Sequence, residues 1–178
     1  MIFSISQLDA SLNQNGAGNT TNFFGNAPDN WNTEHFLDLA EFTAAYAIAY
    51  DWLYDYWQPA QRQAIMWSIL NLGLKWGIQG YTNSSVWFAW WRLPGNNNGN
   101  WNCVCNSGLT MGALAILGDD PTGMAAQMLN FTIPNALQGC AFAPSNDGTW
   151  SETANYWSVN AFLELKGSQV DELSYQLM

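Results

Sequence analysis

Residues with apolar or aromatic character recur at three- and four-residue steps between residues 33 and 57, which is the spacing of one face of a helix. The positions that share this spacing are Phe36, Leu39, Ala40, Thr43, Tyr46, Ala47, Tyr50, Leu53, Tyr54 and Trp57. Thr33 suits the N-cap, and Glu34 suits the first turn, where a carboxylate complements the helix dipole. The pattern predicts an amphipathic helix over residues 33–57.

A second helix is predicted from Pro59 to Gly77. Proline is favoured at the first position of a helix, and Gln58 leaves only a short turn before it. The residues expected to face the core are Ile65, Ile69, Leu72 and Trp76. Because the connection is short, the two helices should be antiparallel neighbours.

Large aromatic residues then gather in residues 77–100, which we expect to form a long loop. They are Trp87, Phe88, Trp90 and Trp91, and they are followed by Arg92 and a run of Asn and Gly. A loop cannot hide so many large rings, so we expect part of this segment to form the wall of a ligand site. Trp91 and Arg92 are the predicted substrate-binding residues, with Arg92 placed to meet an anionic sugar.

Helical spacing continues after this segment, and no strand pattern of comparable strength is present. A third helix is expected over residues 102–117, and a fourth is expected to start at Asp120-Pro121 and to break near Pro134. Two more helices are expected to begin at Ser151 and at Ser168.

These patterns predict an all-α fold built of antiparallel helix hairpins. Residues 1–32 are expected to be irregular, because Gly, Asn and Pro punctuate them and no apolar spacing is sustained. Residues 33–178 should form one helical domain. Since the last helical pattern is still running at Met178, we expect this domain to be truncated.

Composition narrows the classes of partner. The chain of 178 residues has a net charge of −10, which argues against nucleic acid and against an anionic membrane surface as partners. No apolar run approaches the ~20 residues of a membrane span. The 11 Trp residues exceed what a core of this size requires, and spare indole faces suit sugar rings. We expect a monomer that binds carbohydrate.

Cysteines and glycosylation motifs bear on the compartment. Asn19, Asn83 and Asn130 each begin an acceptor sequence for N-glycosylation, which favours secretion, although no signal peptide is visible at the N-terminus. Cys140 could pair with Cys103 or with Cys105 and leave one free thiol, or all three cysteines could be buried and reduced.

A polar stretch leads into the third predicted helix. Asn100, Trp101, Asn102 and Asn106 lie in or beside its first turn, where unpaired N–H groups and the helix dipole favour a carboxylate. The alternative is that these asparagines only cap and turn the chain.

A second stretch, residues 144–157, combines an Asp147-Gly148 turn with Trp150, Glu152 and Tyr156. Glu152 and Tyr156 are four residues apart and therefore share one helix face. Taken with the Asn-Trp-Asn stretch and with the helix over residues 33–57, this pattern resembles the heparinase II/III family of the chondroitin AC/alginate lyase superfamily. The likeness covers residues 33–162.

The resemblance implies an (α/α) toroid that cleaves polysaccharides containing uronic acid by β-elimination without a cofactor or a metal. It implies that Tyr156 is the catalytic phenol and that Asn100 or Asn102 neutralises the uronate carboxyl group. Residues expected to bind the substrate are Trp91, Arg92, Trp101, Asn106, Trp150 and Glu152. The acidic charge of the chain makes alginate or a glucuronan a better candidate than heparin.

Two alternatives remain open. One is a glycoside hydrolase on a similar toroid, with Asp147 and Glu152 as its paired carboxylates. The other is a non-catalytic remnant that binds carbohydrate, because the Asn motif lacks the histidine that family members commonly carry there. The only histidine of the chain is His35, which we expect at the surface at the start of the first helix.

Overall fold

The computed structural model describes residues 31–97 and 99–142, and this part of the chain is helical without a strand. In chain order its elements are the 3₁₀ turn η1 (Thr33–His35), α2 (Phe36–Trp52), α3 (Pro59–Ser68), the π-helical turn η2 (Ile69–Leu74), α4 (Lys75–Thr82), the 3₁₀ helix η3 (Trp87–Arg92), α5 (Asn100–Ile116), α6 (Met124–Gln138) and the 3₁₀ turn η4 (Cys140–Phe142). The all-α prediction is confirmed for these residues. The helices predicted from Ser151 and Ser168, and the segment before residue 31, lie outside the described residues.

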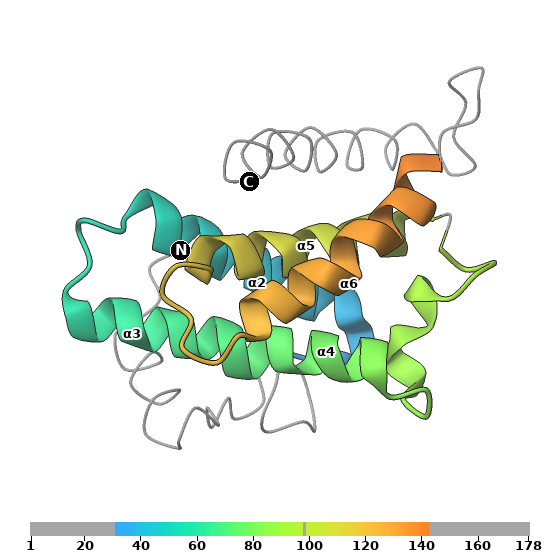
Figure 1. Ribbon diagram of the computed structural model, residues 1–178, viewed down its shortest axis with the longest axis horizontal. Helices are drawn as coiled ribbons and strands as arrows, with labels where there is room; N and C mark the ends of the chain where they lie inside the picture. The colour runs from blue at the N-terminus through green and yellow to red at the C-terminus, as the bar shows by residue number, and fades with distance from the viewer. Residues whose placement is uncertain (1–30, 98, 143–178) are drawn as a thin grey trace.

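The helices form two antiparallel hairpins that pack side by side (Figure 1). In the first hairpin α2 runs against the continuous rod of α3, η2 and α4, and in the second α5 runs against α6. Helix α5 makes its most extensive contacts with α2 and with α6. It therefore joins the two hairpins. His35 contacts Trp101 near the start of α2 and α5, and Tyr50 contacts Asp119 near their ends, so these two helices are parallel.

Two glycines allow α5 to approach α2 closely. A Cβ on Gly108 would overlap the backbone carbonyl of Ala40, and a Cβ on Gly112 would overlap the side chain of Thr43. Gly108 and Gly112 are one helical turn apart and therefore lie on the same face of α5. The Thr43 hydroxyl forms its hydrogen bond within α2, where it donates to the carbonyl of Leu39, 2.7 Å away.

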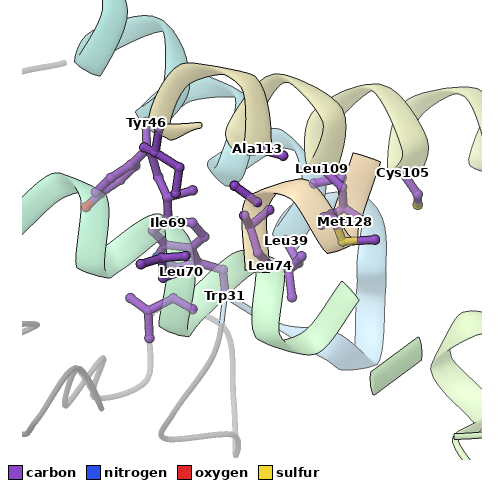
Figure 2. Close-up of a cluster of buried hydrophobic side chains, with 14 of the residues drawn as sticks. Trp31, Leu39, Tyr46, Ile69, Leu70, Leu74, Cys105, Leu109, Ala113 and Met128 are labelled. Carbon is purple, nitrogen blue, oxygen red and sulfur yellow. The ribbon is translucent and has the colours of Figure 1, made fainter. Parts of the chain in front are cut away.

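The core lies where the two hairpins meet. Figure 2 shows side chains from α2, η2, α5 and α6 converging on one another, including Leu39, Ile69, Leu74, Leu109 and Met128. Each of these five is fully buried. Trp31 packs beside Tyr46 at the edge of this cluster, with 4.6 Å between ring centroids. The spacing in the sequence therefore placed the buried face correctly from Phe36 to Tyr50 and from Ile65 to Leu72, whereas the predicted Leu53 and Tyr54 are exposed.

The first helix ends earlier than its sequence pattern predicts. Helix α2 stops at Trp52, and the chain turns through Leu53 before α3 begins at Pro59. The pattern extends to Trp57 because that residue folds back on α2, where its indole N–H donates to the carbonyl of Ala49, 2.9 Å away. Periodicity alone cannot distinguish a ring that continues a helix face from one that returns to it.

Three further boundaries differ from the prediction. Thr33 is the first residue of η1, not an N-cap with a side-chain hydrogen bond. Helix α6 begins at Met124, after Gly123 in a left-handed conformation, and Asp120 caps it from outside the helix by accepting from the backbone N–H of Ala125. Pro134 does not split α6; the residue is exposed, where a missing hydrogen bond costs least.

No helix in the part of the chain that the structure describes is both long enough and apolar enough to cross a bilayer.

Candidate functional site

The predicted site residues that the structure describes gather at one end of the helical stack. This end combines η3, the start of α5 and the last turns of α4 and α6, and it lies at the right of Figure 1. The described members of the prediction are Trp91, Arg92, Asn100, Trp101, Asn102 and Asn106. The other predicted residues, Asp147, Trp150, Glu152 and Tyr156, lie outside the described residues.

The aromatic segment is a 3₁₀ helix and not the long loop that the sequence predicted. Helix α4 continues to Thr82, and η3 covers Trp87–Arg92. Residues three apart share a side of a 3₁₀ helix, so η3 has three rows of side chains, and its backbone departs from helical geometry at Ala89. Phe88 and Trp91 face the core, whereas Trp87 and Trp90 are 65% and 39% exposed. The row that carries Trp87 and Trp90 is therefore the most exposed one.

Trp91 is therefore a core residue and not a wall of a ligand site, which corrects the prediction. It is fully buried, with ring centroids 5.3 Å from Phe36 and 5.9 Å from Tyr81. Its indole N–H has no acceptor among the described residues. The 3₁₀ period turns it inward, which a loop assignment could not anticipate.

Asn102 and Asn106 are also buried, and each uses both its amide nitrogen and its amide oxygen in hydrogen bonds within the protein. Their side-chain amides donate to the Oδ1 atom of Asn135 on α6, at 2.7 Å and 2.9 Å. The amide of Asn102 also donates to the carbonyl of Trp91, and its Oδ1 accepts from the backbone N–H of Cys140. Neither side chain is free to meet a uronate carboxyl group. For Asn102 and Asn106 the geometry agrees with the alternative of a structural role and not with carboxylate neutralisation or substrate binding.

Tyr81 completes this buried network from α4. Its hydroxyl donates to the Oδ1 atom of Asn106, and its ring stacks on Phe131 of α6 with centroids 5.1 Å apart. Burial raises the pKa of Tyr81 well above the ordinary value of a phenol, and the negative charge of a Cys105 thiolate would raise it further. Arg92 and the bond to Asn106 act in the opposite direction but do not reverse the shift. Tyr81 is therefore a fixed hydrogen-bond donor and not a base.

Arg92 is held by its inner nitrogen. Its Nε donates to the carbonyl of Gly80, and its guanidinium carbon lies 5.6 Å from the centre of the Tyr81 ring. Asn135 donates to its backbone carbonyl. Within residues 31–97 and 99–142, no carboxylate forms an ion pair with it. Arg92 is partly exposed, so its terminal nitrogens can accept an anionic group from outside the chain.

A surface of three rings lies at the start of α5, and we call it the Trp90–Trp101 surface. The Trp90 and Trp101 rings are 5.0 Å apart at an angle of 42°, and His35 meets Trp101 edge-on at 4.9 Å. The His35 side chain is 52% exposed, and its Nδ1 is 2.9 Å from the Oδ1 of Asp38. Asn100 is the first residue of α5 and directly precedes Trp101 in the sequence. Its side chain is half-buried.

His35, Tyr81 and Asn135 are the residues that the sequence analysis did not assign to the site. His35 was expected at the surface, which is correct, but the sequence contains no signal that places it against Trp101. Asn135 follows Pro134 in a segment that was read only as a helix break. These residues reach the site because α2 packs parallel to α5 and α6 packs antiparallel to it.

A disulfide closes the same end of the molecule. Cys103 near the start of α5 is bonded to Cys140 in η4, and Cys105 is free and buried. This pairing is one of those left open by the sequence. No group of three or more His, Cys, Asp or Glu residues in the described part of the chain is arranged to hold a metal ion.

Comparison of the chain with protein-family models and with curated proteins finds no match.

Proposed function

We propose that this chain binds an acidic polysaccharide at the Trp90–Trp101 surface. The observation that carries the proposal is the ring pair of exposed Trp90 and partly buried Trp101, 5.0 Å apart, with His35 at its edge. The C–H faces of a sugar ring are apolar and pack on flat indole faces, while an imidazole and an amide at the border supply hydrogen bonds to hydroxyl and carboxylate oxygens. Trp90 is exposed although its neighbours Phe88 and Trp91 on the same short helix are buried, so its position needs an explanation beyond core filling.

The acidic character of the ligand is supported by Arg92. Among the described residues the Arg92 guanidinium has no carboxylate partner, in a chain with 14 acidic and 4 basic residues. It lies on the same short helix as Trp90, two residues away. A uronate would supply the missing carboxylate locally, although the chain as a whole repels polyanions.

The test of binding is a matched set of tryptophan variants. Affinity electrophoresis in gels containing alginate, a glucuronan or a neutral glucan should retard the wild-type chain in at least one of the two uronan gels and leave it unretarded in the neutral gel. Trp90→Ala and Trp101→Ala should each weaken retardation about tenfold, corresponding to about 1.4 kcal/mol. Trp87→Ala removes a still more exposed ring, which contacts Phe88 and is not part of the Trp90–Trp101 surface, and should bind normally. Equal binding by all three variants would contradict the proposal.

A lyase reaction is the second candidate function. It is favoured by the position of His35, which lies against Trp101 of the Asn-Trp-Asn stretch although it is 66 residues earlier in the chain. The family resemblance assigns the catalytic phenol to Tyr156. Asn102 and Asn106 are buried whereas Asn100 is only half-buried, so Asn100 is the better placed candidate for neutralising the carboxyl group.

Product analysis separates the candidates. β-Elimination creates an unsaturated uronate that absorbs ultraviolet light, and Tyr156→Phe or His35→Ala should lower its rate of formation about a hundredfold or more while binding is retained. Hydrolysis would create reducing ends without that absorbance and would support Asp147 and Glu152 as paired carboxylates. Retardation in uronan gels without either product would leave the binding function alone.

The two hairpins are compatible with part of an (α/α) toroid, and we propose that architecture for the whole domain. Corresponding helices of successive hairpins are parallel here, as a ring of repeated hairpins requires. We also propose that the chain is exported, since the Cys103–Cys140 disulfide persists only in an oxidising compartment.

A further inference from the structure

A second group of exposed aromatic residues lies at the opposite end of the helical stack. It is carried by the connection between α2 and α3, at the left of Figure 1, far from η3. Trp52 and Tyr56 are each 75% exposed, and Leu53 and Tyr54 between them are 44% and 37% exposed. Trp52 and Tyr56 are thus more exposed than Trp90 in the proposed polysaccharide site, which is 39% exposed.

The connection holds these rings in place. The indole of Trp57 is bonded to Ala49 and packs against the core. One Nη of Arg62 donates to the carbonyl of Tyr54, 3.2 Å away, and a reciprocal pair of hydrogen bonds between Gln58 and Gln61 caps α3. These hydrogen bonds fix the turn on which Trp52 and Tyr56 are exposed.

Carboxylates surround the rings. We call the group the acidic aromatic patch; it consists of Asp51, Trp52, Tyr54, Asp55, Tyr56 and Asp119. Asp51, Asp55 and Asp119 are all exposed. Asp119 is held at the border of the patch by the hydroxyl of Tyr50, 2.5 Å away, and by that of Tyr54, 3.5 Å away.

One cation already binds to an aromatic ring of this patch. The guanidinium carbon of Arg62 lies 4.4 Å from the centre of the Tyr54 ring. Trp52 has the larger and more electron-rich face, and among the described residues no cation covers it. A positive group placed on Trp52 or Tyr56 would gain both the attraction of the ring face and that of Asp51 or Asp55.

The charge of the patch excludes two other occupants. A uronan would be repelled by the three carboxylates. A second copy of the chain would bring a net charge of −10 and only 4 Lys and Arg residues to the contact. A basic polypeptide has the complementary charge, and tryptophan and tyrosine are the residues that most often dominate the binding energy of protein interfaces.

We propose that the acidic aromatic patch binds a lysine- or arginine-rich segment of another protein, with cationic side chains stacked on Trp52 and Tyr56 and paired with Asp51 and Asp55. This interaction is independent of the proposed polysaccharide site, because it uses the other end of the helical stack. Either site could be abolished without loss of the other.

The probe for the test is a fluorescently labelled synthetic peptide of alternating arginine and glycine, titrated with the full chain at low salt and followed by anisotropy. An acidic protein attracts such a peptide non-specifically, so the decisive variant leaves the charge unchanged. Trp52→Ala combined with Tyr56→Ala should weaken binding at least tenfold. Trp87→Ala removes an indole that is also exposed, at the other end of the stack, and should bind like the wild type. Circular dichroism should show the same helix content in all of these proteins.

A second pair of substitutions tests the carboxylates. Asp51→Asn combined with Asp55→Asn should weaken binding and reduce its dependence on salt, whereas Asp38→Asn, at the other end of α2, should alter binding only a few-fold. Wild-type affinity in the double aromatic variant, or no binding by the wild-type chain at low salt, would overturn the proposal. Neither result would affect retardation in uronan gels.

Discussion

The side-chain amide of Asn135 donates to the backbone carbonyl of Arg92, 2.9 Å away, while its Oδ1 atom accepts from both Asn102 and Asn106. One side chain on α6 thus joins the first turns of α5 to η3, the element that carries Trp90 and Arg92. The network positions these two residues through the buried side chains of Asn102 and Asn106 and the partly buried side chain of Asn135.

Asn135→Ala should be destabilising and should also weaken polysaccharide binding. The substitution leaves the Arg92 carbonyl and two buried amides short of a partner, and each unpaired group costs about 1–3 kcal/mol, so we expect a loss of about 3 kcal/mol in urea denaturation. Because η3 loses its anchor, retardation in uronan gels should fall in variants that are still folded.

Thr132→Val is the matched control for this prediction. It removes the 2.7 Å hydrogen bond between Thr132 and Thr110, which joins α5 to α6 away from η3. We expect a loss of about 1 kcal/mol and unchanged retardation. If both variants lost binding in proportion to stability, Asn135 would have only a structural role.

The sequence was sufficient to predict the helical class, because the spacing of apolar residues reports which face of a helix is buried. Its failures are local and have physical causes. Trp57 has the spacing of a residue that continues α2, but it returns to the helix through a side-chain bond to Ala49. Trp91 lies among exposed aromatic residues in the sequence, but the period of a 3₁₀ helix turns it inward.

The site was predicted less completely, because its geometry depends on helix packing. The Asn-Trp-Asn stretch does lie at a helix start, as expected, and Trp101 is in a surface contact. However, the sequence cannot show that Asn102 faces Asn135, which is 33 residues away, or that His35 faces Trp101. Those contacts follow from the approach of α2 and α6 to α5.

Gly108→Ala tests the close approach of α2 and α5. The added methyl group would overlap the Ala40 carbonyl, an atom that cannot move without shifting α2. Overpacking of this kind costs about 3 kcal/mol, while alanine in place of glycine gains about 1 kcal/mol of helix propensity, so a net loss of about 2 kcal/mol is expected. Gly118→Ala, where a Cβ meets nothing within 4 Å, should change stability little. A neutral or stabilising Gly108→Ala would show that the helices separate easily.

Asp120 should make folding stability depend on pH in the acid range. Burial raises the pKa of its carboxyl group, but hydrogen bonds from Thr122 and from the backbone N–H of Ala125 outweigh this and hold the pKa below its ordinary value. The carboxylate therefore stabilises the fold fully above the unfolded-state pKa of about 4, and this contribution is lost as the pH falls through the lower, folded-state pKa.

Asp120→Ala should accordingly cost about 1 kcal/mol at neutral pH, as loss of a helix cap does, and the difference from wild type should shrink in acid. Thermal denaturation between neutral pH and pH ~2 measures both effects. Asp55→Ala, which removes an exposed carboxylate, provides the control for a change in net charge. A difference between Asp120→Ala and wild type that stayed constant down to the lowest pH would show that the carboxylate charge is not what stabilises α6.

The cysteines provide a test that depends on neither proposed function. The chain has three cysteines, of which Cys103 and Cys140 are bonded, so titration of the denatured and unreduced protein should find one free thiol. In the native protein that thiol should react slowly, because burial raises the pKa of Cys105 well above its ordinary value, the charge of Glu41 raises it further, and the thiolate is the reactive form. Reduction should lower stability by about 2–4 kcal/mol, since the bond closes a loop with a sequence separation of 37. Cys105→Ala should retain the disulfide and lose the titratable thiol, whereas Cys140→Ala should release Cys103. Three free thiols in the unreduced wild type would rule out the disulfide and, with it, the support it gives to export.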